Sequence, residues 1–156
     1  MIEDVVVFDI DGVLADNTNR LHYVTNGETD WEGFYSEIPN DLPNIPMIKL
    51  ANMLYWDMDY NIILLSSRPT YTLPDTQDWL IANEIPSTKI ILRPKDDFDK
   101  LWKVKQLKSI RNDYIILWVF EDDPINIDLF KQNDFPIVPI HSGNWSEVYK
   151  LGLEVK

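Results

Sequence analysis

The stretch that decides the fold is VVVFDIDG, residues 5–12. It opens with four consecutive apolar residues, a pattern typical of a strand buried on both faces of a parallel sheet. Asp9 and Asp11 follow two residues apart, so an extended backbone would direct both carboxylates to the same side. Gly12 then permits a sharp turn that a side chain would obstruct. The stretch therefore predicts a central strand that ends in a pair of acidic side chains.

Further apolar runs predict more strands, with helical patterns between most of them. The strands are expected at residues 62–65, 90–92, 115–120 and 136–140. The helices are expected at residues 47–58, 76–83, 98–110 and 125–132. Strands that alternate with helices predict an α/β fold, a doubly wound parallel sheet covered on both faces. With the first strand central, we expect the strand order 3-2-1-4-5, counted along the chain.

The length of the chain predicts one domain. A chain of 156 residues can bury one sizeable core and is too short for two ordinary domains. Residues 16–45 form a polar stretch dotted with aromatic residues between the first strand and the first helix. We expect this stretch to be a small cap insertion over the site rather than a second domain. The whole of residues 1–156 is thus expected to be a single domain.

Composition and charge restrict the class of partner. The formal net charge is −12, and an acidic surface repels the phosphate backbone, so long nucleic acid is disfavoured as a stable partner. A small phosphorylated substrate remains compatible, because a few local cations and one metal ion can reverse the sign inside a pocket. The chain has no cysteine, which excludes disulfides and thiolate catalysis. No apolar stretch is long enough for a membrane span, and no signal peptide is recognised, so we expect a cytoplasmic protein. The oligomeric state is not indicated.

Polar residues follow three of the predicted strands where each strand ends. Asp9 and Asp11 follow the first, Ser66-Ser67-Arg68 the second, and Glu121-Asp122-Asp123 the fourth. Ligands bind beyond the carboxyl ends of parallel strands, so these groups are expected to converge. Carboxylates that meet without a cation repel one another, and Mg²⁺ prefers oxygen ligands. The pattern suits phosphoryl transfer, in which one carboxylate attacks phosphorus and its neighbour protonates the leaving oxygen.

The same residues resemble the signatures of the haloacid dehalogenase superfamily. DIDGVL, residues 9–14, resembles the first signature, Ser66 the second, a lysine ahead of the fourth strand the third, and Asp122-Asp123 the fourth. A closer resemblance is to the 3′-phosphatase domain of phage polynucleotide kinase and its small stand-alone relatives. It is carried by Arg20, Asp30-Trp31, Phe34, Ser66-Ser67-Arg68-Pro69, Arg93-Pro94, residues 96–100 and Ser142-Gly143. The chain departs from that pattern at Ser67, where glycine is usual, and at Pro124, where arginine is common.

The resemblance implies roles for individual residues. Asp9 would be the nucleophile and Asp11 the general acid/base. Mg²⁺ would be held by Asp9, the backbone carbonyl of Asp11 and Asp122, with Asp123 assisting through water. The transferring phosphoryl group would be bound by Ser66 and Lys100, with Lys95 and Lys103 as alternatives to Lys100. The remaining substrate would be bound by Arg20 and Arg68.

Some of these residues also have plain structural explanations. Asp123 precedes Pro124, which is an ordinary way to start a helix. Glu121 is expected to be a bystander. His22 and His141 lack the neighbours of a metal site or a catalytic triad, so both are expected to be incidental.

The expected function is that of a Mg²⁺-dependent phosphomonoesterase that acts through an aspartyl-phosphate. A nucleotide or a nucleic-acid 3′-phosphate is the expected substrate. A 5′-deoxyribonucleotidase is the alternative, because DIDGVLAD, residues 9–16, and Asn144-Trp145 resemble those enzymes too. A catalytically silent phosphate-binding or protein-interaction module is the alternative from another class. It is disfavoured because every residue type that the reaction requires is present.

Overall fold

The computed structural model describes residues 1–25 and 27–142. Its core is a five-stranded parallel sheet in the order β5-β4-β1-β6-β7, which confirms the predicted order 3-2-1-4-5. The strands of this sheet are β1 (Glu3–Phe8), β4 (Asn61–Pro69), β5 (Lys89–Arg93), β6 (Tyr114–Glu121) and β7 (Ile137–Pro139). The order of the strands reverses at β1, so the ends of β1, β4 and β6 meet at the switch point where α/β sheets bind ligands.

The central position of β1 follows from its uniformly apolar sequence. Val5, Val6, Val7 and Phe8 are at most 1% exposed, because β4 and β6 flank the strand and helices cover both faces. By contrast, β7 is a short edge strand that ends at Pro139, and an edge strand tolerates a residue without a backbone N–H.

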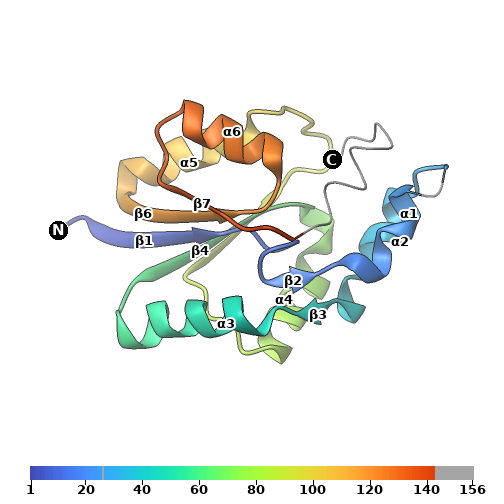
Figure 1. Ribbon diagram of the computed structural model, residues 1–156, viewed down its shortest axis with the longest axis horizontal. Helices are drawn as coiled ribbons and strands as arrows, with labels where there is room; N and C mark the ends of the chain where they lie inside the picture. The colour runs from blue at the N-terminus through green and yellow to red at the C-terminus, as the bar shows by residue number, and fades with distance from the viewer. Residues whose placement is uncertain (26, 143–156) are drawn as a thin grey trace.

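Helices cover the sheet in two layers (Figure 1). On one face, α5 (Trp102–Asp113) and α6 (Pro124–Gln132) pack over Val5 and Val7. On the other, α3 (Ile45–Asn52) and α4 (Leu73–Ala82) pack over Val6 and Phe8. Successive side chains of a strand point to opposite faces, so one apolar run supplies both halves of the core.

The predicted helices exist, and their ends differ from the sequence expectation for local reasons. The helix expected at residues 47–58 is α3 followed by a π-helical turn, η3 (Met53–Asp57). Helix α4 begins earlier than expected because Pro74 suits the first turn of a helix. Helix α5 begins at Trp102, since residues before it form turns in which Asp99 accepts a hydrogen bond from the Leu101 amide.

The segment from residue 16 to residue 45 leaves and rejoins the sheet through a two-stranded antiparallel ribbon, β2 (Ala15–Asp16) and β3 (Leu42–Pro43). Between these strands lie the 3-10 turn η1 (Thr18–Arg20), α1 (His22–Thr25), α2 (Trp31–Ser36) and the 3-10 turn η2 (Ile38–Asn40). A further 3-10 turn, η4 (Thr70–Thr72), connects β4 to α4. The segment has its own small apolar cluster of Val24, Phe34, Tyr35 and Ile38. Figure 1 shows α1 and α2 beyond the end to which β1 points.

Within residues 1–25 and 27–142, no helix has both the length and the apolar character of a membrane span. Gly143, Asn144 and Trp145, which carry part of the sequence resemblances, lie outside the described residues.

Candidate active site

A small pocket of about 40 Å³ opens at the carboxyl ends of β1, β4 and β6. Without side-chain movement it has room only for a small polar group. Asp9 and Asp11 line it from the end of β1, and Ser66, Ser67 and Arg68 line it from β4. Its other lining residues are Asn17, Phe34, Tyr35, Lys103, Glu121, Asp123 and Asn126. The pocket thus unites the polar residues that follow the three strands with two aromatic side chains of the inserted segment.

Asp9, Glu121 and Asp122 form a carboxylate cluster on one side of the pocket. All three residues are buried, and one oxygen atom of each lies within 4.8 Å of the others. Asp9 follows β1, whereas Glu121 ends β6 and Asp122 follows it, so stretches of chain that are remote in sequence meet here. The structure therefore places Asp9 and Asp122 close enough for one cation to contact both.

Gly12 makes this approach possible. Its φ of +80° is a conformation that residues with a β-carbon rarely adopt. A β-carbon at this position would lie 1.8 Å from the Asp122 Oδ2 atom. The sequence suggested only a turn at Gly12, and the close contact with Asp122 is a second reason for glycine there.

Lys103, and not Lys100, is the lysine that the structure brings into the pocket. The Lys103 Nζ atom lies 3.0 Å from Asp9 Oδ1 and 2.7 Å from Glu121 Oε2, and its side chain is 5% exposed. Lys100 is exposed and precedes α5, and the Lys95 ammonium lies over the Tyr71 ring instead. The resemblance implied Lys100, which follows Asp96 at an Asp-x-x-x-Lys spacing. Asp99 and Lys103 show the same spacing, and the inward side of α5 distinguishes the two lysines.

Glu121 is not the bystander that the sequence suggested. Its Oε2 atom accepts a hydrogen bond from Lys103, and its Oε1 atom accepts one from each of the backbone amides of Asp122 and Asp123. Both oxygen atoms are therefore engaged in holding Lys103 and the acidic loop in place. We assign Glu121 a positioning role from these contacts.

Asp123 serves as the helix cap that its position before Pro124 indicated. Its Oδ1 atom accepts a hydrogen bond from the Ile125 amide at 2.9 Å, and its Oδ2 atom accepts one from Asn126 at 3.2 Å. The Asp122 side chain points elsewhere, and its Oδ2 atom accepts a hydrogen bond from the Ser142 hydroxyl at 2.8 Å. The two neighbouring aspartates thus lie in different environments, with Asp122 in the carboxylate cluster.

The electrostatics of the carboxylate cluster fit a divalent cation. Burial, and then the negative charge of Glu121, raise the pKa of Asp9 well above its ordinary value. Asp122 raises it further, and Lys103 opposes these effects. Among the described residues, the Lys103 ammonium pairs with two of the three carboxylates, and all of the clustered ligand atoms are oxygens. Hard oxygen donors with excess negative charge are the ligand set that Mg²⁺ prefers.

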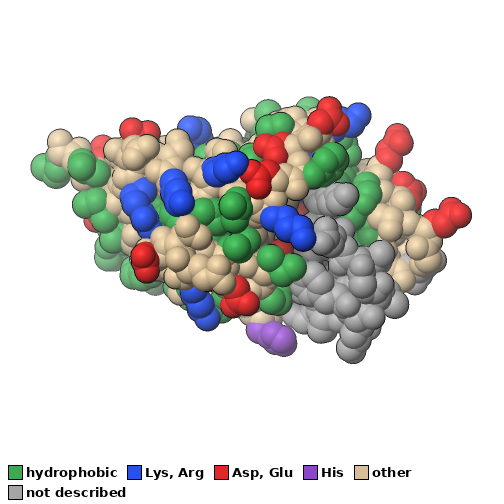
Figure 2. Space-filling view, turned by 90° about the horizontal axis from the view of Figure 1, so that it is seen from above, with side chains coloured by type: hydrophobic (Ala, Val, Ile, Leu, Met, Phe, Trp, Pro, Cys, Tyr) green, Lys and Arg blue, Asp and Glu red, His purple; other side chains and the backbone are tan. Residues whose placement is uncertain are grey.

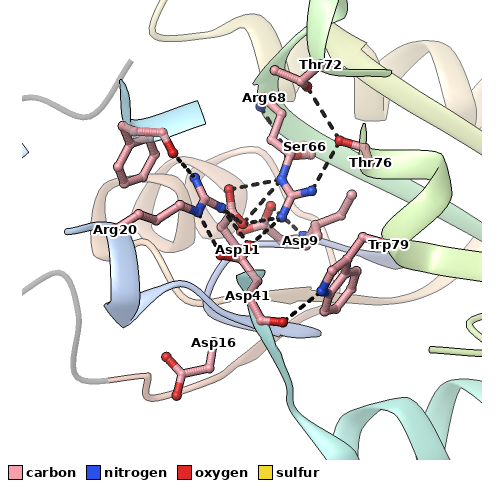
Figure 3. A network of polar contacts seen from close by, with 12 residues as sticks. Asp9, Asp11, Asp16, Arg20, Asp41, Ser66, Arg68, Thr72, Thr76 and Trp79 are labelled. Carbon is pink, nitrogen blue, oxygen red and sulfur yellow. Dashed lines mark hydrogen bonds and ion pairs between the residues drawn. The ribbon is translucent and has the colours of Figure 1, made fainter. Parts of the chain in front are cut away.

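Arg20, Arg68, Asp11 and Asp41 form an arginine cluster on the other side of the pocket (Figure 3). Arg20 holds Asp41 with two hydrogen bonds, from Nε at 2.8 Å and from an Nη atom at 2.9 Å. The same Nη atom of Arg20 also lies 2.7 Å from Asp11 Oδ1, and an Nη atom of Arg68 lies 2.7 Å from the same oxygen. Arg68 also donates to Asp41 at 3.1 Å and to the Thr76 hydroxyl at 3.1 Å. The side chains of both arginines are fully buried, so neither is the surface residue that a lone arginine usually is.

Asp41 is a site residue that sequence reasoning missed. Asn40-Asp41 is an ordinary turn signal, which concealed a buried carboxylate. In the structure the Asp41 side chain has no exposed surface, and its backbone carbonyl accepts a hydrogen bond from Trp79 Nε1 at 2.9 Å. Burial raises the pKa of Asp41 to about 6 against the effect of Arg20. A chain that buries two arginines requires acidic partners for both, and that requirement was the available signal.

The pKa values of the two β1 aspartates move in opposite directions. Burial alone would raise the pKa of Asp11, but Arg20 and Arg68 lower it to about 2. Asp11 in this arrangement is a carboxylate that accepts hydrogen bonds. Asp9 has the raised pKa described above. Ser66 lines the same pocket, is 1% exposed, and accepts a hydrogen bond from the Arg68 amide at 3.1 Å.

The sequence from residue 3 to residue 145 matches the family described as "Polynucleotide kinase PNKP phosphatase domain". The chain belongs to this family. It is a phosphatase domain of the haloacid dehalogenase superfamily. No curated protein matches the sequence closely enough to serve as a relative.

Solved structures share the fold of this PNKP-type phosphatase domain. A chain of the Pnkp1/Rnl/Hen1 RNA repair complex superposes with a TM-score of 0.71 at 23% identity, over 90% of this chain and 43% of that one. The class C acid phosphatase from Bacillus anthracis gives a TM-score of 0.69 at 16% identity, over 99% of this chain and 74% of that one. A haloacid dehalogenase-like hydrolase from Streptococcus pneumoniae gives 0.67 at 12% identity, over 97% and 92%. The chain therefore spans less than half the length of the RNA repair protein that it resembles.

Proposed function

We propose that the chain is a Mg²⁺-dependent phosphomonoesterase that acts through an aspartyl-phosphate on Asp9, on a nucleotide or nucleic-acid 3′-phosphate. The observation that carries the proposal is the meeting of Asp9, Lys103 and Asp122 at the carboxyl end of β1. A carboxylate nucleophile, a fixed cation and a second carboxylate for a metal ion are the parts that phosphoryl transfer requires.

The proposed metal ligands are Asp9, Asp122 and the backbone carbonyl of Asp11, with Asp123 acting through water. Bound Mg²⁺ would neutralise charge on the nucleophile and on the transferring phosphoryl group. Its presence would also oppose the raised pKa of Asp9 and keep this carboxylate ionised at neutral pH. The helix-capping contacts of Asp123 leave it a supporting role.

The proposed reaction has two steps. A carboxylate oxygen of Asp9 forms a bond to phosphorus as the bond to the ester oxygen breaks, and Asp11 gives its proton to the leaving oxygen. Water then attacks the aspartyl-phosphate, with Asp11 now taking up the proton, and inorganic phosphate leaves. Lys103 and Ser66 would bind the oxygens of the phosphoryl group, so Lys103 takes the role that the sequence suggested for Lys100.

The arginine cluster explains how Asp11 could act as an acid. With both guanidinium groups on its carboxylate, the pKa of Asp11 is too low for proton donation at neutral pH. An anionic substrate in the pocket would compete for Arg20 and Arg68, and the loss of these contacts would raise the pKa of Asp11. Substrate binding would thereby prepare the acid.

The proposed substrate is a 3′-phosphorylated nucleotide or nucleic acid, and the inserted segment is proposed to be a small cap. The family description and the likeness to a chain of an RNA repair complex support a 3′-phosphorylated nucleotide or nucleic acid. The inserted segment contributes Asn17, Phe34 and Tyr35 to the pocket wall, which supports its role as a small cap within a single domain.

Hydrolysis of a generic aryl phosphate tests the chemistry. Wild type should hydrolyse it only when Mg²⁺ is present. The Asp9→Asn variant should not hydrolyse it with or without Mg²⁺. A panel of 3′-nucleotides, 5′-nucleotides and 3′-phosphorylated oligonucleotides then tests the substrate. Preference for 5′-deoxyribonucleotides would favour the 5′-deoxyribonucleotidase alternative. A wild-type protein that binds phosphate without turning over any ester would favour the silent module.

A further inference from the structure

A strip of aromatic and basic side chains, of which one arginine is buried and the others are exposed, extends outward from the wall of the pocket. We define the rim strip as Tyr71, Arg93, Lys95 and Phe98. Tyr71 lies in η4, directly after β4, and the other three lie at the end of β5 and in the loop that follows it. None of the four lines the pocket, and the reaction described above uses none of them.

Both aromatic side chains of the rim strip are exposed. Tyr71 is 51% exposed and Phe98 is 58% exposed. Tyr71 contacts Tyr35 edge-on, with ring centroids 6.3 Å apart, and Tyr35 is a buried residue of the pocket wall. The surface of Tyr71 is therefore continuous with the pocket.

Each exposed ring is accompanied by a cation. The Lys95 ammonium lies 5.9 Å from the centroid of Tyr71, and the Arg93 guanidinium lies 5.4 Å from the centroid of Phe98. Arg93 is buried and held in place, since it donates to the backbone carbonyl of Asp97 at 2.7 Å and to that of Ser67 at 3.2 Å. Ser67 itself lines the pocket, so Arg93 fixes the loop that carries Lys95 and Phe98 against the pocket rim.

Exposed aromatic faces beside cations are the groups that bind single-stranded nucleic acid, because bases stack on the rings and phosphates pair with the cations. We propose that the rim strip is a second subsite, at which Tyr71 stacks a nucleobase and Lys95 pairs with the phosphate on the 5′ side of the terminal nucleotide. This inference rests on the proposed function. It identifies the occupant as a single-stranded, 3′-phosphorylated end at least two nucleotides long.

The surrounding charge indicates a short footprint. On the face shown in Figure 2, basic side chains are scattered among hydrophobic and neutral ones over α5 and α6, and acidic ones gather toward the end that carries α1 and α2. Burial, and then the negative charge of Glu32 on α2, raise the pKa of the Tyr71 hydroxyl. Stacking, more than charge, should therefore supply the preference for the extra nucleotide.

The test compares kcat/KM for a 3′-phosphorylated dinucleotide with kcat/KM for the matching 3′-mononucleotide, in Mg²⁺, with an aryl phosphate measured alongside. Stacking of one base is worth about 1–3 kcal/mol. The wild-type ratio should thus be at least roughly fivefold in favour of the dinucleotide. Tyr71→Ala should bring this ratio close to one, and Lys95→Gln should lower it by about two- to fivefold and weaken its dependence on salt.

Matched controls lie outside the rim strip. Trp56 is 71% exposed, lies in η3, and is not among the residues that line the pocket, so Trp56→Ala removes an exposed aromatic ring elsewhere. Lys108→Gln removes an exposed lysine from α5. Neither should change the ratio.

The outcomes separate the subsite from the proposed function. A wild type that turns over the aryl phosphate and both nucleotides with a ratio near one would overturn the subsite and leave the proposed function standing. A ratio that survives Tyr71→Ala would overturn it too. Absence of turnover of every ester would overturn both.

Discussion

The two sides of the pocket balance their charges differently. In the arginine cluster, two guanidinium groups face the carboxylates of Asp11 and Asp41, and every group has an oppositely charged partner within 3.1 Å. In the carboxylate cluster, Lys103 pairs with Asp9 and Glu121, and the carboxylate of Asp122 lies beside theirs. Both clusters are buried at the carboxyl ends of the same strands. Among the described residues, the arginine cluster matches two cations with two carboxylates, whereas the carboxylate cluster brings one ammonium group to three carboxylates.

We infer from this difference that the arginine cluster preorganises the site, whereas the carboxylate cluster carries out the chemistry. A complete network holds its members in one geometry, which suits a device that orients Asp11 and the substrate. An incomplete cluster raises the pKa of its nucleophile and destabilises the folded chain until a cation arrives. We expect substitutions in the carboxylate cluster to abolish the reaction, and substitutions in the arginine cluster to slow it.

The largest effect is expected for Asp9→Asn. Loss of the nucleophile should reduce kcat by at least about 10³-fold. A carboxyl group with a pKa raised by folding stabilises the fold at low pH and loses that contribution as pH rises through the folded-state value. Without divalent cations at neutral pH, Asp9→Asn should therefore stabilise the fold and raise Tm. Each kcal/mol added to the free energy of unfolding should raise Tm by about 2–4 °C. Calorimetry and the aryl phosphate assay measure both changes. Asp4→Asn, at the other end of β1, is the control and should leave both near wild type.

Lys103→Gln should have the next largest effect. It leaves Glu121 and Asp9 buried without their cation, so the free energy of unfolding should fall by about 3–5 kcal/mol. Turnover by the remaining folded protein should fall by about 10²-fold or more. Urea titration and the aryl phosphate assay measure these effects. Lys100→Gln should leave the free energy of unfolding near wild type and change the rate of turnover by no more than about twofold. An inactive Lys100→Gln beside an active Lys103→Gln would reverse the assignment of the lysine.

Asp41→Asn should have a smaller and more selective effect. It removes the negative charge that orients both arginines, and Asp41 belongs neither to the carboxylate cluster nor to the residues that line the pocket. We expect kcat to fall by about 10- to 100-fold, as for other residues that hydrogen-bond to and orient the side chains of a site. Mg²⁺ affinity should change little. Steady-state kinetics at several Mg²⁺ concentrations make the distinction. A large loss of Mg²⁺ affinity would show that the two clusters do not act separately.

The smallest effect concerns pH. Protons and Mg²⁺ compete for Asp9, whose pKa is raised, so activity should decline as pH falls and the acid limb should lie at higher pH when Mg²⁺ is scarce. The acid limb of the kcat/KM profile should shift to lower pH, by up to about one pH unit for each tenfold increase in free Mg²⁺. An acid limb that does not respond to Mg²⁺ would show that the titrating proton does not compete with the metal ion for Asp9.

Local sequence determined the sheet more completely than the site. The apolar run before Asp9 and the alternation of strands and helices were enough for the strand order, because a buried parallel strand has a distinctive pattern. The convergence of Asp9 and Asp122 follows from that order, since the carboxyl ends of neighbouring strands share one edge.

The exact partners of the charged residues could not be read from the sequence. Lys100 and Lys103 share the same spacing from an aspartate, and only the start of α5 at Trp102 determines which one turns inward. Asp41 resembles a turn residue until the path of the inserted segment brings it against Arg20 and Arg68. Such pairings depend on side-chain packing between segments that are far apart in the chain.

Direct titration with Mg²⁺ tests the central claim that Asp9 and Asp122 share one divalent cation. Isothermal titration calorimetry of wild type, Asp122→Asn and Asp41→Asn in the absence of substrate should show one ion per wild-type chain. Affinity should fall at least about tenfold in Asp122→Asn and stay near wild type in Asp41→Asn. Wild-type affinity in Asp122→Asn, or an equal loss in both variants, would contradict the account.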